Sequence, residues 1–337
     1  MVGEPGEATL SVGLRARRCA GWALAIAAIA AAVLVPVPAQ AIIGGSATPK
    51  GQLRGLARVA LPDDLCTGSL VAPRLVLTAL HCVQAPQGGL SPDAIGRQAI
   101  VTVGNPNDRG RVQARGVVAV FVAPQVTPPP PVTHQVDAAI LVLDRKVSVA
   151  PVRFAPPAEA LALTAGGLPV LLAGFGASVA PPPSPDGRLA VLEASKLLKN
   201  ATLTVVTCPS ADAEASPFVT CAQPAALTGA AQLNGNSCAG DSGAPLFART
   251  AGNALAQVGV LSGGEGVDQC SQTNTTIFTP LNEPIARWVL TVGGTALPPP
   301  AAAPRSCGRL RKSLRRARRH KQRTVADRLA RRVYRDC

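Results

Sequence analysis

The feature that most constrains this sequence is the tetrapeptide Gly-Asp-Ser-Gly at residues 240–243. Its serine, Ser242, stands between two glycines and directly follows an aspartate. The same four residue types also form ordinary surface turns, since glycine, serine and aspartate all favour turn conformations. The tetrapeptide therefore indicates a reactive serine only when other segments of the chain supply the groups that such a serine needs.

Two other segments supply those groups. They are Thr-Ala-Leu-His-Cys at residues 78–82 and Asp-Ala-Ala-Ile-Leu-Val-Leu at residues 137–143. A serine hydroxyl is a poor nucleophile until a neighbouring base takes its proton, and a carboxylate can orient that base. The order His81, Asp137, Ser242 is one of three chain orders in which such a triad occurs. We therefore predict that these three residues form a catalytic triad.

In this combination the segments resemble those of the trypsin/chymotrypsin-like serine protease family, and the resemblance covers roughly residues 42–292. It implies an all-β fold of two six-stranded antiparallel β-barrels, at about residues 42–155 and 156–292, with a short C-terminal helix. It also implies a serine endopeptidase, a hydrolase that cleaves peptide bonds through an acyl-enzyme. The many short apolar runs separated by turns agree with this fold class.

The resemblance assigns a role to each residue of the predicted site. His81 is the base for Ser242 and then the acid for the leaving amine, while Asp137 orients the imidazole. The backbone N–H groups of Gly240 and Ser242 are expected to form the oxyanion hole, where negative charge develops. Two alternatives stay open: a catalytically silent protease-like binding module, and an esterase that uses the same triad.

The N-terminal segment, residues 1–41, is typical of a secretory signal peptide. Three arginines precede an apolar stretch at residues 20–35, and Ala-Gln-Ala at residues 39–41 fits a signal peptidase site. A membrane anchor is the alternative, although this stretch is short for a span. We expect a secreted, extracellular protein, with cell-wall association left open. The alanine and arginine usage suggests a bacterial source.

Cleavage after residue 41 would expose the sequence Ile-Ile-Gly-Gly at residues 42–45. In the family that the chain resembles, a new N-terminal ammonium pairs with the aspartate before the reactive serine. This makes Ile42 and Asp241 the expected activation pair. Because no separate propeptide follows the Ala-Gln-Ala site, we expect signal peptidase itself to generate the active N-terminus. Removal of a short propeptide by a second protease is the alternative.

The substrate preference is predicted from four positions. By the resemblance, Asn236, six residues before the serine, lies at the base of the primary pocket, where trypsin itself has an aspartate. Gly264 and Thr276 map to the pocket walls, and Ser262 borders the cleft and hydrogen-bonds the aspartate of the triad. Without a carboxylate at the base there is little reason to favour arginine or lysine. We predict cleavage after small or medium uncharged residues.

The chain has nine cysteines, of which Cys19 lies in the predicted signal peptide. The other eight can pair completely, which is typical of an oxidising, extracytoplasmic compartment. Eight cysteines allow 105 connectivities, and the resemblance selects three pairs, while a fourth follows from the expected tail structure. The four expected disulfides are Cys66–Cys82, Cys208–Cys221, Cys238–Cys270 and Cys307–Cys337.

The formal net charge of +14 is concentrated in the last 33 residues. Residues 305–337 hold 14 lysines and arginines against 2 aspartates, whereas residues 42–304 hold 16 basic and 15 acidic residues. We expect a Pro/Ala linker at residues 293–306 and a basic, disulfide-closed helical hairpin at residues 307–337. Such a tail fits binding to an anionic cell-surface polymer, and a solubilising surface is the alternative.

Other partners and cofactors are expected to be few. The tail has one aromatic residue, Tyr334, and no base-reading motif, so we expect no sequence-specific nucleic acid. The loop at residues 104–111 lacks the carboxylate cluster of calcium-binding family members, so we expect no metal, and the triad chemistry needs no cofactor. The expected partner is a protein or peptide substrate bound by a monomer.

Overall fold

The computed structural model describes most of the chain between Ile42 and Gly294. The described residues are 42–62, 64–84, 90–108, 112–125, 135–178, 197–224, 235–265, 270–271 and 274–294, together with Lys312, Ser313 and Arg316. The predicted signal peptide, most of the predicted linker and the Cys307–Cys337 pair lie outside these residues, so those predictions stay predictions.

Six antiparallel strands between residues 56 and 143 form the first barrel. They are β2 (Leu56–Ala60), β3 (Leu65–Ala72), β4 (Leu75–Thr78), β5 (Ile100–Val103), β6 (Gln113–Val122) and β7 (Ala139–Leu143). Their order around the closed barrel is β2-β3-β4-β7-β6-β5. In β5, Val101 and Val103 are buried while Ile100 and Thr102 are partly exposed. Because side chains alternate between the two faces of a strand, this pattern gives the barrel wall its buried face.

Six further strands form the second barrel. They are β8 (Pro169–Gly174), β9 (Lys199–Val206), β10 (Thr220–Pro224), β11 (Pro245–Arg249), β12 (Leu255–Glu265) and β13 (Thr275–Pro280). They follow the order β8-β9-β10-β13-β12-β11, and pairing between β11 and β8 closes the ring. The short strand β1 (Ser46–Ala47) adds to β9 from outside. The predicted all-β fold of two six-stranded antiparallel barrels is therefore confirmed.

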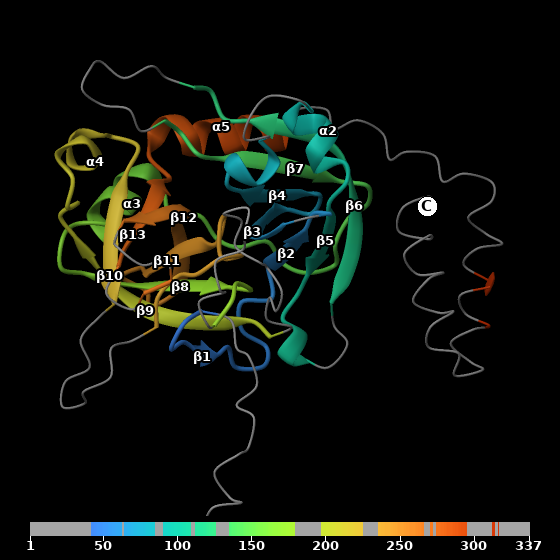
Figure 1. Ribbon diagram of the computed structural model, residues 1–337, viewed down its shortest axis with the longest axis horizontal. Coiled ribbons are helices and arrows are strands. Elements are labelled where there is room, and N and C mark those ends of the chain that lie inside the picture. The colour runs from blue at the N-terminus through green and yellow to red at the C-terminus, as the bar shows by residue number, and fades with distance from the viewer. Residues whose placement is uncertain are drawn as a thin grey trace, which may run out of the picture. The chain divides into compact units, whose positions relative to one another are not determined.

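Strand β3 of the first barrel contacts the second barrel at β11 and, through one hydrogen bond, at β12 (Figure 1). Ser69 on β3 donates a hydrogen bond of 2.8 Å to the Gln257 side chain on β12. Gln257 in turn donates to the carbonyl of Gly259 at 3.1 Å. Both side chains are fully buried, and leaving a buried polar group unpaired costs about 1–3 kcal/mol. This pair therefore helps to fix how the barrels sit against each other.

Helix α5 (Glu283–Gly294) ends the described part of the barrels and returns to the first one (Figure 1). Its buried residues Ile285 and Val289 pack in one apolar cluster with Leu77 of β4 and Ile140 of β7. The expected short C-terminal helix is present. Because the helix follows the second barrel in sequence but covers the first, it ties the two halves of the fold together.

The remaining helices are short. They are the 3-10 helices η1 (His81–Val83) and η2 (Pro106–Asp108) and the helices α2 (Pro92–Gly96), α3 (Pro157–Leu163) and α4 (Ala211–Ala215). Of the described helices, none is long and apolar enough to cross a membrane.

Three disulfides brace the two barrels. The structure contains the bonds Cys66–Cys82, Cys208–Cys221 and Cys238–Cys270, which are the three pairs that the resemblance implied for this part of the chain. The first joins β3 to η1, and the third links the segment before Ser242 to the segment before β13. Disulfides of this kind are typical of extracellular proteins.

Candidate active site

Strand pairing brings the predicted histidine and aspartate together. Thr78, at the end of β4, pairs with Ala139, at the start of β7. His81 lies three residues after the end of β4, and Asp137 lies two residues before β7. Because the strands are antiparallel neighbours, both residues leave the first barrel at the same edge. The separation of 56 residues along the chain thus becomes direct contact in the fold.

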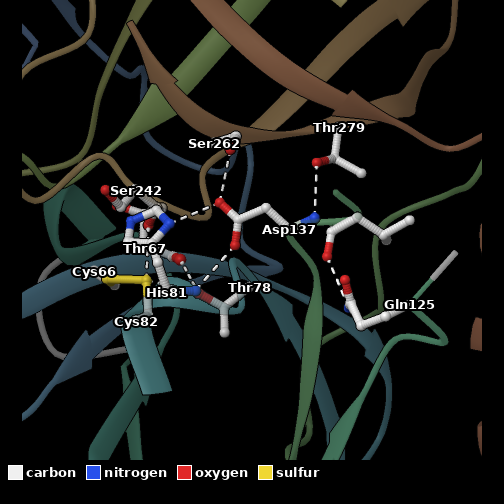
Figure 2. Close-up of polar contacts among 11 residues, drawn as sticks. Cys66, Thr67, Thr78, His81, Cys82, Gln125, Asp137, Ser242, Ser262 and Thr279 are labelled. Atoms are coloured by element: carbon white, nitrogen blue, oxygen red, sulfur yellow. Dashed lines mark hydrogen bonds and ion pairs between the residues drawn. A yellow bond between two sulfur atoms is a disulfide. The ribbon is translucent and has the colours of Figure 1, made fainter. Parts of the chain in front are cut away.

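Asp137 accepts two hydrogen bonds from His81, one from its backbone and one from its imidazole (Figure 2). The His81 backbone N–H donates to Asp137 Oδ1 at 2.9 Å, and His81 Nδ1 lies 2.7 Å from Asp137 Oδ2. The hydroxyl of Ser262 also donates to Oδ2, at 2.7 Å. A carboxylate can only accept, so Nδ1 carries the proton. In the neutral ring, Nε2 is therefore an acceptor that can take a proton from a hydroxyl.

The same contacts raise the pKa of His81 and lower the pKa of Asp137, as a histidine base with a charged carboxylate partner requires. Burial alone would lower the pKa of His81, but the hydrogen bond to Asp137 and the charges of Asp137 and Asp64 raise its pKa above the ordinary value. Burial alone would raise the pKa of Asp137, but hydrogen bonds from His81 and Ser262 hold it below the usual value. Asp137 thus stays ionised, and the imidazole is a stronger base than in free histidine.

Ser242 lies against the segment that carries His81. The backbone N–H of Thr67 donates to the Ser242 carbonyl at 2.8 Å. The next residue, Gly243, has φ +80°, and a Cβ there would lie 2.2 Å from the Thr78 hydroxyl and 2.8 Å from the Ala79 nitrogen. Only glycine allows this approach. In Figure 2, Ser242 is drawn beside the imidazole of His81, on the side away from Asp137.

The loop before Ser242 offers two free donors. Within the described residues, the backbone N–H groups of Gly240 and Ser242 have no acceptor, whereas those of Asp241, Gly243 and Ala244 donate to the carbonyls of Cys238, Leu261 and Asp241. Unpaired N–H groups next to a reactive hydroxyl are what an oxyanion hole requires.

Thr67 is a residue that the sequence did not single out. It is fully buried on β3, and its hydroxyl donates to the Gly240 carbonyl at 3.0 Å. The same hydroxyl accepts the Phe175 backbone N–H at 3.1 Å. Together with the bond from its own N–H to Ser242, these contacts fix two carbonyls of the loop around Ser242. Its position next to Cys66 was the only sequence feature that could have pointed to Thr67. That feature is weak, because nothing in the sequence shows that the Thr67 hydroxyl reaches across to the second barrel.

Comparison with protein families gives a match to the trypsin family over residues 42–289. This span contains both barrels, the paired His81 and Asp137, and Ser242. The chain belongs to the trypsin family. Membership places it among the serine proteases, a class of hydrolases that binds protein or peptide substrates. A comparison with curated proteins finds no significant match.

Ile42 and Asp241, the predicted activation pair, are both buried. Both residues are 0% exposed. The Asp241 carboxylate accepts hydrogen bonds from the N–H groups of Gly176 at 2.8 Å and Cys238 at 3.0 Å. Burial raises the pKa of Asp241 to about 7, although both hydrogen bonds act in the opposite direction. Within the described residues this carboxylate has no cationic partner.

Two of the residues predicted to form the primary pocket, Asn236 and Thr276, belong to a connected polar group. Asn236 and Thr276 are buried, and the Thr276 hydroxyl donates to Asn236 Oδ1 at 2.5 Å. The Ser237 hydroxyl lies 3.0 Å from that of Thr276. Gly264 pairs with Thr276 across β12 and β13 and is exposed. Ser262, by contrast, contacts Asp137 of the predicted triad.

A metal centre does not fit the ligands gathered here. Among the described residues, one group of potential ligands lies within 4.8 Å: Cys66, His81 and Cys82. The two cysteines are joined in a disulfide, and metal binding by cysteine requires a thiolate. His81 is held by Asp137 instead, as described above.

Proposed function

We propose that this trypsin-family protein is a secreted serine endopeptidase in which Ser242, His81 and Asp137 form the catalytic triad. The observation that carries the proposal is the doubly hydrogen-bonded pair of Asp137 and His81, with Ser262 as a further donor to the carboxylate. The segment of Ser242 lies against the same barrel edge. This arrangement leaves His81 Nε2 able to accept the serine proton.

The reaction follows from these positions. Ser242 Oγ attacks the carbonyl carbon of the substrate while its proton passes to His81 Nε2, and Asp137 stabilises the charged imidazole. The N–H groups of Gly240 and Ser242 stabilise the oxyanion, and each such donor is worth roughly 100- to 1000-fold in rate. His81 then gives its proton to the leaving amine. A water molecule attacks the acyl-enzyme in the same way and releases the second product.

We assign activation to cleavage before Ile42. The new α-ammonium would supply the cation that Asp241 lacks among the described residues. Its pKa is ordinarily about 8 and rises when the group pairs with a carboxylate. Gly45 donates to the Ile42 carbonyl at 2.9 Å, which turns the segment back on itself. Signal peptidase remains the proposed enzyme for this cut, and N-terminal sequencing of the secreted protein tests it.

The pH dependence of stability is expected to differ between the uncleaved and cleaved forms. Since the folded-state pKa of Asp241 is raised to about 7, a form with extra residues before Ile42 should lose stability as the pH rises from about 4 to about 7. A free Ile42 ammonium lowers the pKa of Asp241 and should remove most of this loss. Thermal unfolding of both forms, in a Ser242→Ala background that prevents self-digestion, measures it. Equal pH dependence of the two forms would contradict the proposed pairing.

The proposed substrate preference is for small or medium uncharged residues before the cleaved bond. Thr276 is buried and hydrogen-bonded to Asn236, which we expect to shorten the pocket. None of the four predicted pocket residues, Asn236, Ser262, Gly264 and Thr276, is charged. Digestion of a peptide library by the purified secreted protein tests both activity and preference. Cleavage after alanine, serine, threonine or valine is expected, and cleavage concentrated after arginine or lysine would refute the preference.

The same digestion separates the proposed function from its two alternatives. A catalytically silent binding module would cleave no peptide and would not react with a fluorophosphonate probe. An esterase would react with the probe and hydrolyse simple esters while leaving the peptide library intact. An endopeptidase gives both probe labelling and peptide cleavage.

We also propose that the basic tail, residues 305–337, attaches the secreted protein to an anionic cell-surface polymer. The proposal rests on its charge, 14 basic against 2 acidic residues, and it predicts binding that weakens with salt. Full-length protein should be retained on isolated cell walls at low salt and released at high salt, while a form ending at residue 304 should not be retained. Equal retention of both forms would leave the tail with a solubilising role.

A further inference from the structure

We propose that Asn236 is a positioning residue that couples the N-terminal segment, residues 42–45, to the wall of the primary pocket, and that it does not itself bind the substrate side chain. This inference rests on the proposed function, because it concerns the same site. It replaces the simpler expectation that the residue at this position selects the substrate by direct contact.

The main chain around Asn236 is joined to the N-terminal segment. The Asn236 N–H donates to the Ile43 carbonyl at 2.8 Å, and the two residues form an antiparallel bridge. At the neighbouring Gly235, a Cβ would lie 2.3 Å from both the Ile43 oxygen and the Gly45 nitrogen. The backbone at residues 235–236 therefore lies directly on the N-terminal segment, and any change in one must move the other.

The side chain of Asn236 is joined to the pocket wall. Its Nδ2 donates to the carbonyls of Ser271 at 3.0 Å and Asn274 at 2.8 Å. Its Oδ1 accepts from the Ser237 N–H at 2.8 Å and from the Thr276 hydroxyl at 2.5 Å. Because carbonyl oxygens cannot donate, the amide can take only this orientation.

These four contacts use the full capacity of the side chain. An asparagine amide has two N–H donors and two acceptor positions, and each of them is filled by the protein. The residue is also only 1% exposed. Asn236 therefore has no polar atom left for a substrate, and its contacts instead hold residues 271–276 in place relative to residues 42–45.

The same network decides what the pocket can offer to a substrate. The Thr276 hydroxyl has one proton, which it gives to Asn236 Oδ1, so it can only accept from Ser237. The Ser237 hydroxyl must then donate to Thr276, which leaves only its lone pairs free. Since Ser237 is partly exposed, it offers an acceptor and no charge. This agrees with an uncharged substrate side chain and disfavours a carboxylate.

The Asn236→Asp variant tests the inference, because it places a trypsin-like carboxylate at this position. One carboxylate oxygen would face the carbonyls of Ser271 and Asn274, with two donated hydrogen bonds replaced by repulsion. We expect kcat/KM on an alanine substrate to fall roughly 10- to 100-fold, with no gain for arginine substrates. The activity relative to wild type should partly recover as the pH is lowered, because burial raises the carboxyl pKa and the protonated group can donate once.

A second variant and a matched control keep the result interpretable. Asn236→Ala removes the contacts without adding charge, so it should also lower kcat/KM while keeping the order of preferred substrates. Asn105→Asp is the control: Asn105 is equally buried, at 1% exposed, and its Nδ2 also donates to two carbonyls, those of Pro49 and Gln52, at 3.0 Å. This control should lower the melting temperature without changing the pH profile relative to wild type.

Two kinetic results would overturn the inference. The first is an Asn236→Asp variant whose preference for arginine over alanine rises 100-fold or more. The second concerns Asn236→Ala, and it takes either of two forms. The variant keeps wild-type kcat/KM on all substrates, or it keeps kcat/KM on its best substrate while its relative preference among substrates changes more than tenfold. Either would show that Asn236 contacts the substrate or that the coupling is unimportant.

A readout that needs no turnover separates this inference from the proposed function. The rate at which cyanate carbamylates the Ile42 α-amine of the secreted protein reports how firmly the N-terminal segment is inserted. We expect carbamylation at least tenfold faster in Asn236→Ala than in wild type or Asn105→Asp. If wild type cleaves no peptide but this difference is found, the proposed function fails and the coupling stands. If peptides are cleaved and the rates are equal, the coupling fails.

Discussion

Replacing Ser242 by alanine is expected to lower kcat on the order of 10⁶-fold, the loss typical when the nucleophile of a triad is removed. KM should change little, because the hydroxyl acts mainly on the reaction step and not on substrate binding. Stability should be unaffected or nearly so, since within the described residues Ser242 is held by its carbonyl, which accepts the Thr67 N–H, and not by its side chain. Steady-state kinetics on the best library peptide, together with fluorophosphonate labelling, measures the effect.

A matched serine shows that the loss is specific. Ser91 caps helix α2, where its hydroxyl accepts the Ala94 N–H at 3.3 Å. Ser91→Ala should cost about 1 kcal/mol of stability and leave kcat within twofold of wild type. If Ser242→Ala kept more than a hundredth of the wild-type kcat, or still reacted with the probe, another residue would be the nucleophile and the proposed mechanism would be wrong.

Asp137→Asn is the second large effect, with kcat expected to fall about 10⁴-fold. Asp137 accepts from three donors: the His81 N–H, the His81 ring and the Ser262 hydroxyl. An asparagine has only one oxygen, so its NH₂ group must face one of these donors. When it faces the ring, Nδ1 becomes the acceptor and Nε2 carries the proton. His81 can then no longer take the proton of Ser242.

The kinetic pattern distinguishes this cause from loss of structure. Because the imidazole acts in the transition state, kcat and kcat/KM should fall by similar factors. Asp93→Asn is a suitable control, because Asp93 also accepts a backbone N–H, from Val120 at 3.0 Å, and a cationic side chain, Arg97. The control should keep wild-type kcat. Retention of a tenth of the activity or more in Asp137→Asn would contradict the role given to the carboxylate.

Much of the fold could be predicted because its signals are local. Short apolar runs such as residues 100–103 and 139–143, separated by turns, are properties of the strands themselves. The closure of each ring could not be read in this way, because it depends on pairings between distant strands such as β2 with β5. The resemblance to a known family supplied the expectation of two six-stranded barrels, and it also selected three disulfide pairs that residue spacing alone leaves open.

The sequence by itself determined the residue types and their order: a histidine, an aspartate and a serine in flanking segments that match one family, eight cysteines that can pair, and a cationic tail. Tertiary structure decided which side chains still have hydrogen-bond donors or acceptors that no other protein group uses. Thr67 became a support of the serine loop because β3 lies against the second barrel, and the Asn236 amide has no hydrogen-bonding capacity left because four protein atoms already use it. A hydrogen-bonding group can be satisfied only by neighbours in space, and those neighbours exist only once the chain has folded.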